Sequence, residues 1–92
     1  MTSTETLTMY EQIAGLTAKM AVAAQTGNRD QLSALERQCA LQAAPAASGV
    51  PPLAGAARQR KIDLLKQIMA NDRAIRAVTE PWELSTVMAA TH

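Results

Sequence analysis

The 92-residue sequence contains almost no aromatic side chains: Tyr10 and Trp82 are the only two, and phenylalanine is absent. A β-sandwich or β-barrel normally draws on aromatic and β-branched residues, so this scarcity argues against an all-β fold. The apolar residues are mostly Ala, Leu, Ile, Val and Met, and of these Ala, Leu and Met are strong helix formers. The composition therefore predicts an all-α fold.

Groups that carry out chemistry are equally scarce. The single cysteine, Cys39, excludes an internal disulfide, and the single histidine, His92, lies at the C-terminus, where chains usually fray. The acidic residues are scattered singly, and there is no glycine-rich phosphate loop. An active site needs a nucleophile with its base, a metal cluster or a phosphate cradle. We therefore expect no enzyme, no metal site and no cofactor, and we expect Cys39 to be a buried, unreactive thiol.

The sequence also lacks a strong net charge and a long apolar run. The net charge of +1 provides no long-range field directed at nucleic acid or a membrane. No apolar segment approaches the roughly 20 residues of a membrane-spanning helix, and the first residues do not resemble a secretory signal. The cytoplasm is the expected location. The length predicts one domain, residues 1–92, whose small core favours reliance on a partner or a second copy.

Two helices are predicted in the first half of the chain. Over about residues 4–26 apolar side chains recur with a 4-3-4-3 spacing and share one face, namely Met9, Ile13, Leu16, Met20 and Ala23. Gly27-Asn28 is a suitable stop, because both residue types accept the left-handed conformation that ends helices. Asp30 is the expected N-cap of a second helix over 30–44, whose weaker stripe contains Leu32, Leu35, Cys39 and Ala43. The short turn predicts a helical hairpin.

The second half begins with a proline- and glycine-rich linker, residues 45–55, which we expect to be mobile. A long third helix is predicted over about 56–79. Pro81 should end or sharply kink it, since a proline disfavours helical geometry in the residue before it. Residues 81–91 then form a short fourth helix with Pro81 at its first position. The expected architecture is an antiparallel bundle of three main helices plus a short C-terminal helix.

The third predicted helix has two apolar edges. One edge contains Ile62, Leu65 and Met69. The other contains Leu64, Ile68, Ile75 and Val78. The resulting apolar arc is about 200° wide, twice the stripe of an ordinary surface helix. Either this helix is central and packs on two neighbours, or its second face receives a partner helix. The two interpretations are compatible, because the fourth helix could cover the second face until a partner displaces it.

The same helix carries six of the nine basic residues: Arg58, Arg60, Lys61, Lys66, Arg73 and Arg76. A solvated face is the simplest interpretation, followed by a contact strip for an acidic protein. Nucleic-acid binding comes third, because no recognition motif or stacking aromatic accompanies the charge. Asp72 lies within the apolar arc. It is interpreted as an acid paired with Arg76 four residues on, or alternatively as an acceptor for an incoming partner.

These elements form a recognisable order. Tyr10 lies in the first helix, and Gly27-Asn28-Arg29-Asp30 leads to Leu32 and Leu35-Glu36 in the second. After the linker come Ile62, Leu65 and Ile68, and then the more specific ending Asp72…Ile75-Arg76…Glu80-Pro81-Trp82. This order resembles the FliT family of flagellar export chaperones over nearly the whole chain.

The resemblance implies a cytosolic chaperone that binds the filament-cap protein (FliD) through an amphipathic C-terminal segment of that client. It implies that the client is kept unassembled and brought to the type III export machinery. Some members also bind the flagellar master regulator and the export ATPase. The family's tail covers part of the binding surface, and the matching residues here are Trp82, Leu84, Val87 and Met88. This sequence stops soon after Trp82, at His92, which weakens the expectation of autoinhibition and of regulator and ATPase binding.

Physical chemistry agrees with such a role, because an amphipathic client segment needs an apolar groove between helices. Methionines such as Met69 and Met88 repack easily and suit an adaptable groove. The expected partner-binding site lies between the second and third helices: Leu32, Leu35, Cys39, Leu65, Ile68, Met69 and Ile75. The alternative function is a structural or regulatory helical-bundle protein acting as a dimeric interaction subunit. A homodimer is expected if apolar surface stays exposed.

Overall fold

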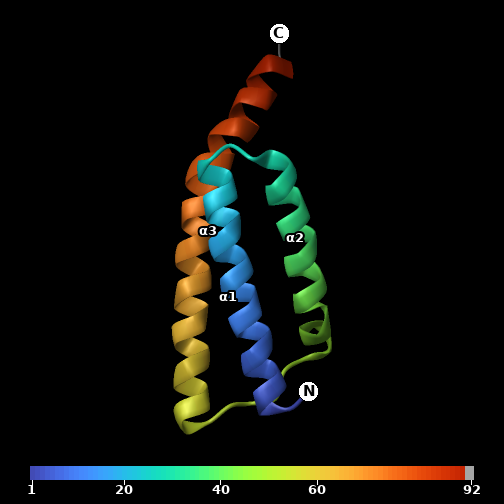
Figure 1. Ribbon diagram of the computed structural model, residues 1–92, viewed down its shortest axis with the longest axis vertical. Helices are drawn as coiled ribbons and strands as arrows, with labels where there is room; N and C mark the ends of the chain where they lie inside the picture. The colour runs from blue at the N-terminus through green and yellow to red at the C-terminus, as the bar shows by residue number, and fades with distance from the viewer. Residues whose placement is uncertain (91–92) are drawn as a thin grey trace.

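The computed structural model describes residues 1–90, and Thr91, the expected polar end of the fourth helix, and His92 lie outside the described residues. The predicted all-helical class is confirmed, since no strand occurs within residues 1–90. The elements are α1 (Ser3–Gln25), α2 (Arg29–Ala43), the short 3-10 helix η1 (Ala44–Ser48) and α3 (Gly55–Ala90). Figure 1 shows α1 between α2 and α3, and both of these helices pack on it.

The first two helices begin and end within a residue of the predicted limits, and local hydrogen bonds explain where. Thr2 and Glu5 form a capping box: the amide of Glu5 donates to Thr2 Oγ1 at 3.1 Å, and the amide of Thr2 donates to Glu5 Oε1. After α1, Gly27 adopts a φ of 74°, which glycine accepts without strain. The predicted N-cap of α2, Asp30, is wrong. Asn28 is the cap and accepts a 3.1 Å hydrogen bond from the amide of Gln31.

The proline-rich connection contains more structure than its composition suggested. Its first part, Ala44–Ser48, is the 3-10 helix η1, which directly continues from α2. Pro45 is tolerated there because it lies in the first turn of η1, where backbone amides have no partner within the helix, and its carbonyl accepts a 3.1 Å hydrogen bond from the Ser48 hydroxyl. Irregular backbone is confined to residues 49–54. The mobility of this connection stays a prediction.

The predicted end of the third helix is wrong. α3 runs without interruption from Gly55 to Ala90 and contains Pro81, so there is no separate fourth helix within residues 1–90. Its 36 residues amount to about 54 Å of helix, which equals the longest dimension of the molecule, 54 × 22 × 20 Å. Figure 1 shows the C-terminal part of α3 leaning away from the line of the rest and projecting beyond the α1–α2 turn.

The hydrophobic core concentrates at the end of the molecule where α1 turns into α2. Its buried centre consists of Ala23, Ala24, Leu32 and Leu35. Half-buried side chains from α1 and α3 pack around it, namely Leu16, Met20, Val78 and Trp82. Val78 and Trp82 lie four residues apart and therefore on one face of α3, on either side of Pro81. Their burial holds the helix in place across the proline.

Asparagine and threonine side chains join α1 to α3 in the middle of the molecule. The Asn71 amide donates to Thr17 Oγ1 at 3.1 Å and to the carbonyl of Ala14 at 3.4 Å. The Thr17 hydroxyl also donates to the Ala14 carbonyl, at 3.0 Å. Because Thr17 is buried, losing these partners would leave polar groups unsatisfied. The bonds therefore fix which face of α3 packs on α1.

Candidate partner-binding surface

The predicted partner-binding residues fall into three groups with different burial. Leu32, Leu35 and Ile75 are buried, each 7% exposed or less, and belong to the core. Cys39, Leu65 and Ile68 are half-buried. Met69 is 56% exposed and is the one predicted site residue that lies fully on the surface. A partner could reach Leu65, Ile68 and Met69 on α3 without opening the core.

Helix α1 separates the two walls of the predicted site. Within residues 1–90, α2 and α3 each pack on α1 and not along each other. At 100° per residue, Ile13 and Met20 lie between the α1 face that packs on α2 and the face that bonds Asn71. Both are half-buried, and sequence reasoning assigned them only to the core stripe of the first helix. The α2 and α3 parts of the predicted site are therefore joined by an edge of α1.

The predicted tail residues do not act together in this conformation. Trp82 is half-buried against the core cluster, and the Arg29 guanidinium lies 4.4 Å from the centroid of its ring. Leu84, Val87 and Met88 are each about 60% exposed. They lie on the part of α3 that projects beyond the α1–α2 turn (Figure 1). The role of Arg29 was missed, because a contact between α2 and the end of α3 leaves no periodic signal in the sequence.

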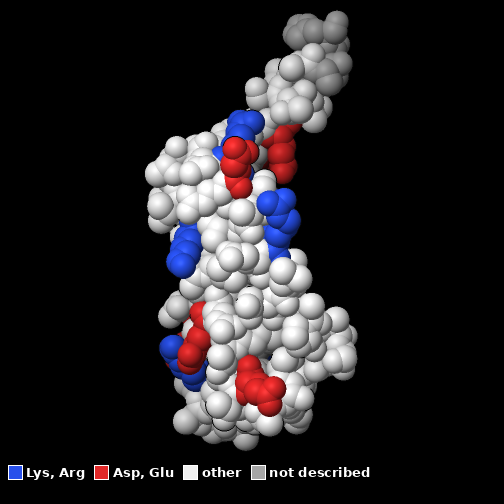
Figure 2. Space-filling model, turned by 45° about the vertical axis from the view of Figure 1, so that its right-hand side comes forward, with Lys and Arg blue, Asp and Glu red and all other residues white. Residues whose placement is uncertain are grey.

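Charge is absent from the exposed end of α3. Residues 84–90 contain no charged side chain. Figure 2 shows the projecting end without visible charge, while blue and red side chains gather just below it and along the edges of the molecule. The predicted Asp72–Arg76 ion pair is present, with 3.0 Å between Arg76 Nε and Asp72 Oδ2, and both side chains are largely exposed. A partner of the end of α3 must therefore offer apolar rather than charged groups.

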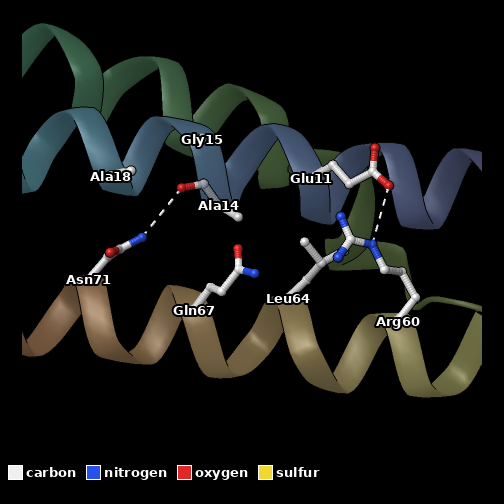
Figure 3. Close-up of a pocket in the computed structure, with 8 residues that line it drawn as sticks. All are labelled: Glu11, Ala14, Gly15, Ala18, Arg60, Leu64, Gln67 and Asn71. Atoms are coloured by element: carbon white, nitrogen blue, oxygen red, sulfur yellow. Dashed lines mark hydrogen bonds and ion pairs between the residues drawn. The ribbon is translucent and has the colours of Figure 1, made fainter.

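A hollow of about 460 Å³ lies between α1 and α3 on another side of the molecule (Figure 3). Small residues of α1 form one wall, namely Ala14, Gly15 and Ala18. Gln67 points into it from α3, and the Glu11–Arg60 pair bridges the two helices at 3.7 Å. The hollow exists because these α1 side chains are too small to fill the space.

Replacing Gly15 with alanine is expected to raise the free energy of unfolding by about 0.5–1 kcal/mol. Gly15 is exposed within α1, has no positive φ, and a Cβ there would meet no atom within 4 Å. The gain comes from the lower conformational entropy of the unfolded chain. Urea denaturation measures it. Gly27→Ala is the matched control and should destabilise, because Gly27 has a φ of 74°. Equal effects of the two substitutions would contradict this account.

Cys39, the single thiol of the sequence, is half-buried on α2. Burial raises the pKa of the half-buried Cys39 thiol above its ordinary value, so less of the reactive thiolate is present at neutral pH. Residues 1–90 contain no cluster of three or more His, Cys, Asp or Glu side chains of the kind that binds a metal ion. Among the described residues, no helical stretch combines the length and the hydropathy that a bilayer crossing requires.

The fold and this surface define a small helical protein whose distinguishing feature is an exposed apolar strip on one long helix. A family model described as "Flagellar protein FliT" matches residues 7–90, which is 84 of the 92 residues. The chain belongs to the FliT family, as its motifs indicated. FliT is a chaperone family, and membership implies a flagellar export chaperone. No curated protein and no solved structure matches the chain.

Proposed function

We propose that this protein binds the amphipathic C-terminal segment of the filament-cap protein (FliD), keeps it unassembled and delivers it to the type III export machinery. The observation that carries the proposal is the apolar surface on α3, where Met69 is 56% exposed beside half-buried Leu65 and Ile68. A client helix that covers this surface would remove apolar area from water on both partners. Fully burying a methionine side chain alone contributes roughly 1.5–3 kcal/mol.

The proposed site is narrower than the sequence suggested. Leu65, Ile68 and Met69 would contact the client directly, and Cys39 would lie on the α2 side of the same surface. Leu32, Leu35 and Ile75 are buried, so they would support the helices beneath the client rather than touch it. This division follows the helix-in-groove mode, in which a client's apolar face needs exposed apolar side chains and a rigid support.

Family membership supports the remaining steps of the proposal. The chaperone would meet its client in the cytoplasm before export, without direct contact to nucleic acid or a membrane. Contacts with the flagellar master regulator and the export ATPase would use surfaces other than Leu65, Ile68 and Met69, so that a client can stay bound during delivery. Arg58, Lys66 and Arg73 of α3 are exposed and make no ion pair with a described residue, so they are available to an acidic partner.

Met69→Asp is expected to abolish co-purification of the filament-cap segment. The substitution places a charge where the client's apolar face must lose its water, and an unpaired buried charge is strongly unfavourable. Because Met69 is exposed, the fold should survive, with unchanged helical content by circular dichroism. Isothermal titration with the purified C-terminal segment measures the affinity.

Leu41→Asp is the matched control, since Leu41 is 74% exposed on α2 and lies outside the proposed site. It introduces the same charge into a helix and should bind the segment like the wild type. If folded Met69→Asp retains wild-type affinity, the client binds elsewhere. If both variants lose binding equally, the effect is one of net charge and not of this surface.

A further inference from the structure

Two exposed cations of α3 flank the proposed client surface. Lys66 precedes Met69 by three residues and Arg73 follows it by four, so both are its neighbours on the surface of the helix. Both side chains are exposed. Within residues 1–90 neither makes an ion pair, whereas Arg76, three residues beyond Arg73, is paired with Asp72 at 3.0 Å. The proposed surface therefore has positive charge beside it that no side chain of the described residues neutralises.

The sequence around the two cations explains why they have no partner on their own helix. A helix brings together the side chains of residues three and four positions apart. Around Arg73, none of those four positions holds an acidic residue. Lys66 has one acid at such a distance, Asp63, and the Asp63 carboxylate instead accepts a 3.0 Å hydrogen bond from the Gln59 amide. Both cations are therefore available to the side chains of another molecule.

The apolar side chains beside these cations follow the spacing of a seam between paired helices. Ile62, Leu65 and Met69 are separated by three and then four residues, as are successive a, d and a positions of a heptad. In that register Lys66 and Arg73 both take the e position, which lies along one edge of the seam. A client helix that covers the apolar seam therefore brings one of its own edges to the two cations.

The apolar seam is short, so contacts along its edge matter for selectivity. After Met69, the next d and a positions hold the ion pair of Asp72 and Arg76. The apolar part thus extends only from Ile62 to Met69, about 10 Å of helix. Three apolar side chains discriminate poorly between clients, because every amphipathic helix offers a similar stripe. Charges at the edge positions of paired helices, by contrast, determine which partner is accepted.

We propose that Lys66 and Arg73 are specificity-determining residues that select a client helix with carboxylates along one edge of its apolar stripe. The inference rests on the proposed function, since it concerns the same surface of α3. Lys66 and Arg73 are seven residues apart, or two helical turns, so the client carboxylates are expected at the same spacing. The stems of both side chains cover the rim of the client's apolar face while their charged groups meet the carboxylates. A client with a basic edge is disfavoured, because it would place like charges together at both positions.

The test uses designed helical peptides with one common apolar stripe, and fluorescence anisotropy measures their affinity for the full chain. Two edge peptides each carry a pair of glutamates seven residues apart, one peptide for each edge, because parallel and antiparallel docking bring different edges to the cations. A third peptide carries the same glutamates opposite the stripe and so has the same composition and net charge. The better edge peptide should bind about fivefold more tightly than the third. Added NaCl should reduce this advantage, because salt screens exposed charges.

Charge reversal on the protein identifies the contacts. The double variant Lys66→Glu, Arg73→Glu should bind the better edge peptide at least about tenfold more weakly than the wild type does. It should instead prefer a peptide with lysines in place of those glutamates. The matched control is Lys19→Glu, Arg37→Glu, which changes the net charge equally at exposed positions on α1 and α2 and should keep the wild-type affinities. Circular dichroism verifies the helical content of both variants.

Titration of the filament-cap segment in parallel separates this selectivity from the proposed function. Edge peptides that bind the wild type no more tightly than the third peptide overturn the selectivity, and so does an equal loss of affinity in the control variant. If the segment still binds the wild type and not Met69→Asp, the proposed function stands without it. If the peptides behave as expected but the segment does not bind the wild type, the proposed function fails and the selectivity of the surface stands. If both hold, Lys66→Glu, Arg73→Glu weakens binding of the segment as well.

Discussion

Leu64→Ala is expected to lower the free energy of unfolding by about 3 kcal/mol, within the 2–5 kcal/mol typical of such core truncations. Leu64 is 2% exposed and is one of the two largest fully buried side chains. The α1 residues near it are small, among them Ala14 and Ala18 (Figure 3), so no neighbouring side chain can fill the space left behind. The total free energy of unfolding of a small domain is only about 5–15 kcal/mol, so this loss is a large fraction of its stability.

Urea denaturation of the purified chain measures the change, and thermal unfolding gives a second reading. About 3 kcal/mol corresponds to a fall in Tm of roughly 12–24 °C for a domain of this size. Leu41→Ala is the matched control: Leu41 is 74% exposed, and its truncation should stay within about 0.5 kcal/mol of the wild type. Similar effects of the two truncations would mean that the α1–α3 seam contributes little to stability.

The first half of the fold could be read from the sequence because its signals are local. Apolar spacing and the Gly27 stop define α1 and α2 to within a residue. Asp30 was misplaced as the cap because Asn28 and Asp30 are both good caps, and only hydrogen-bond geometry decides between them. The capping box of Thr2 and Glu5 was not predicted from the sequence.

Pro81 shows where local rules stop being sufficient. A proline within a helix costs about 3 kcal/mol or more, which favours a helix end at that point. Contacts with other parts of the chain offset this cost. Val78 and Trp82 pack on the core at the α1–α2 end, and Arg29 stacks on the Trp82 ring. Nothing in residues 81–91 reveals that these partners lie within reach.

For a similar reason, the sequence could not show which of the predicted site residues are exposed. A helical stripe tells which residues share a face, but it does not tell which face enters the core. Leu32, Leu35 and Ile75 turned out to be buried, while Met69 is exposed. On α3 the choice depends on the hydrogen bonds of Asn71 to α1, which orient the helix and have no signature in the sequence pattern.

Trp82→Ala is expected to lower the free energy of unfolding by about 2 kcal/mol. Truncating a fully buried tryptophan to alanine lowers the free energy of unfolding by about 3–5 kcal/mol. The loss is expected to be smaller here because Trp82 is half-buried. The loss includes its packing on the core cluster and the cation–π contact with Arg29, which contributes roughly 0.5–2 kcal/mol. The effect should be strongest beyond Pro81, because the helix there already lacks a backbone hydrogen bond and would lose its attachment to α1 and α2.

Hydrogen exchange of residues 83–90, compared with that of α1, measures how the loss is distributed along the chain. In Trp82→Ala these amides should exchange faster than in the wild type, while the middle of α1 keeps most of its protection. Leu84→Ala is the matched control, since Leu84 is 61% exposed two residues away and its truncation should change neither stability nor exchange appreciably. Arg29→Ala should reproduce the faster exchange with a smaller loss of stability, about 1 kcal/mol, because it removes only the stacking partner. If Trp82→Ala loses stability uniformly and Arg29→Ala changes nothing, the end of α3 is not held by this contact, and its direction beyond the α1–α2 turn must be set by the rest of the helix.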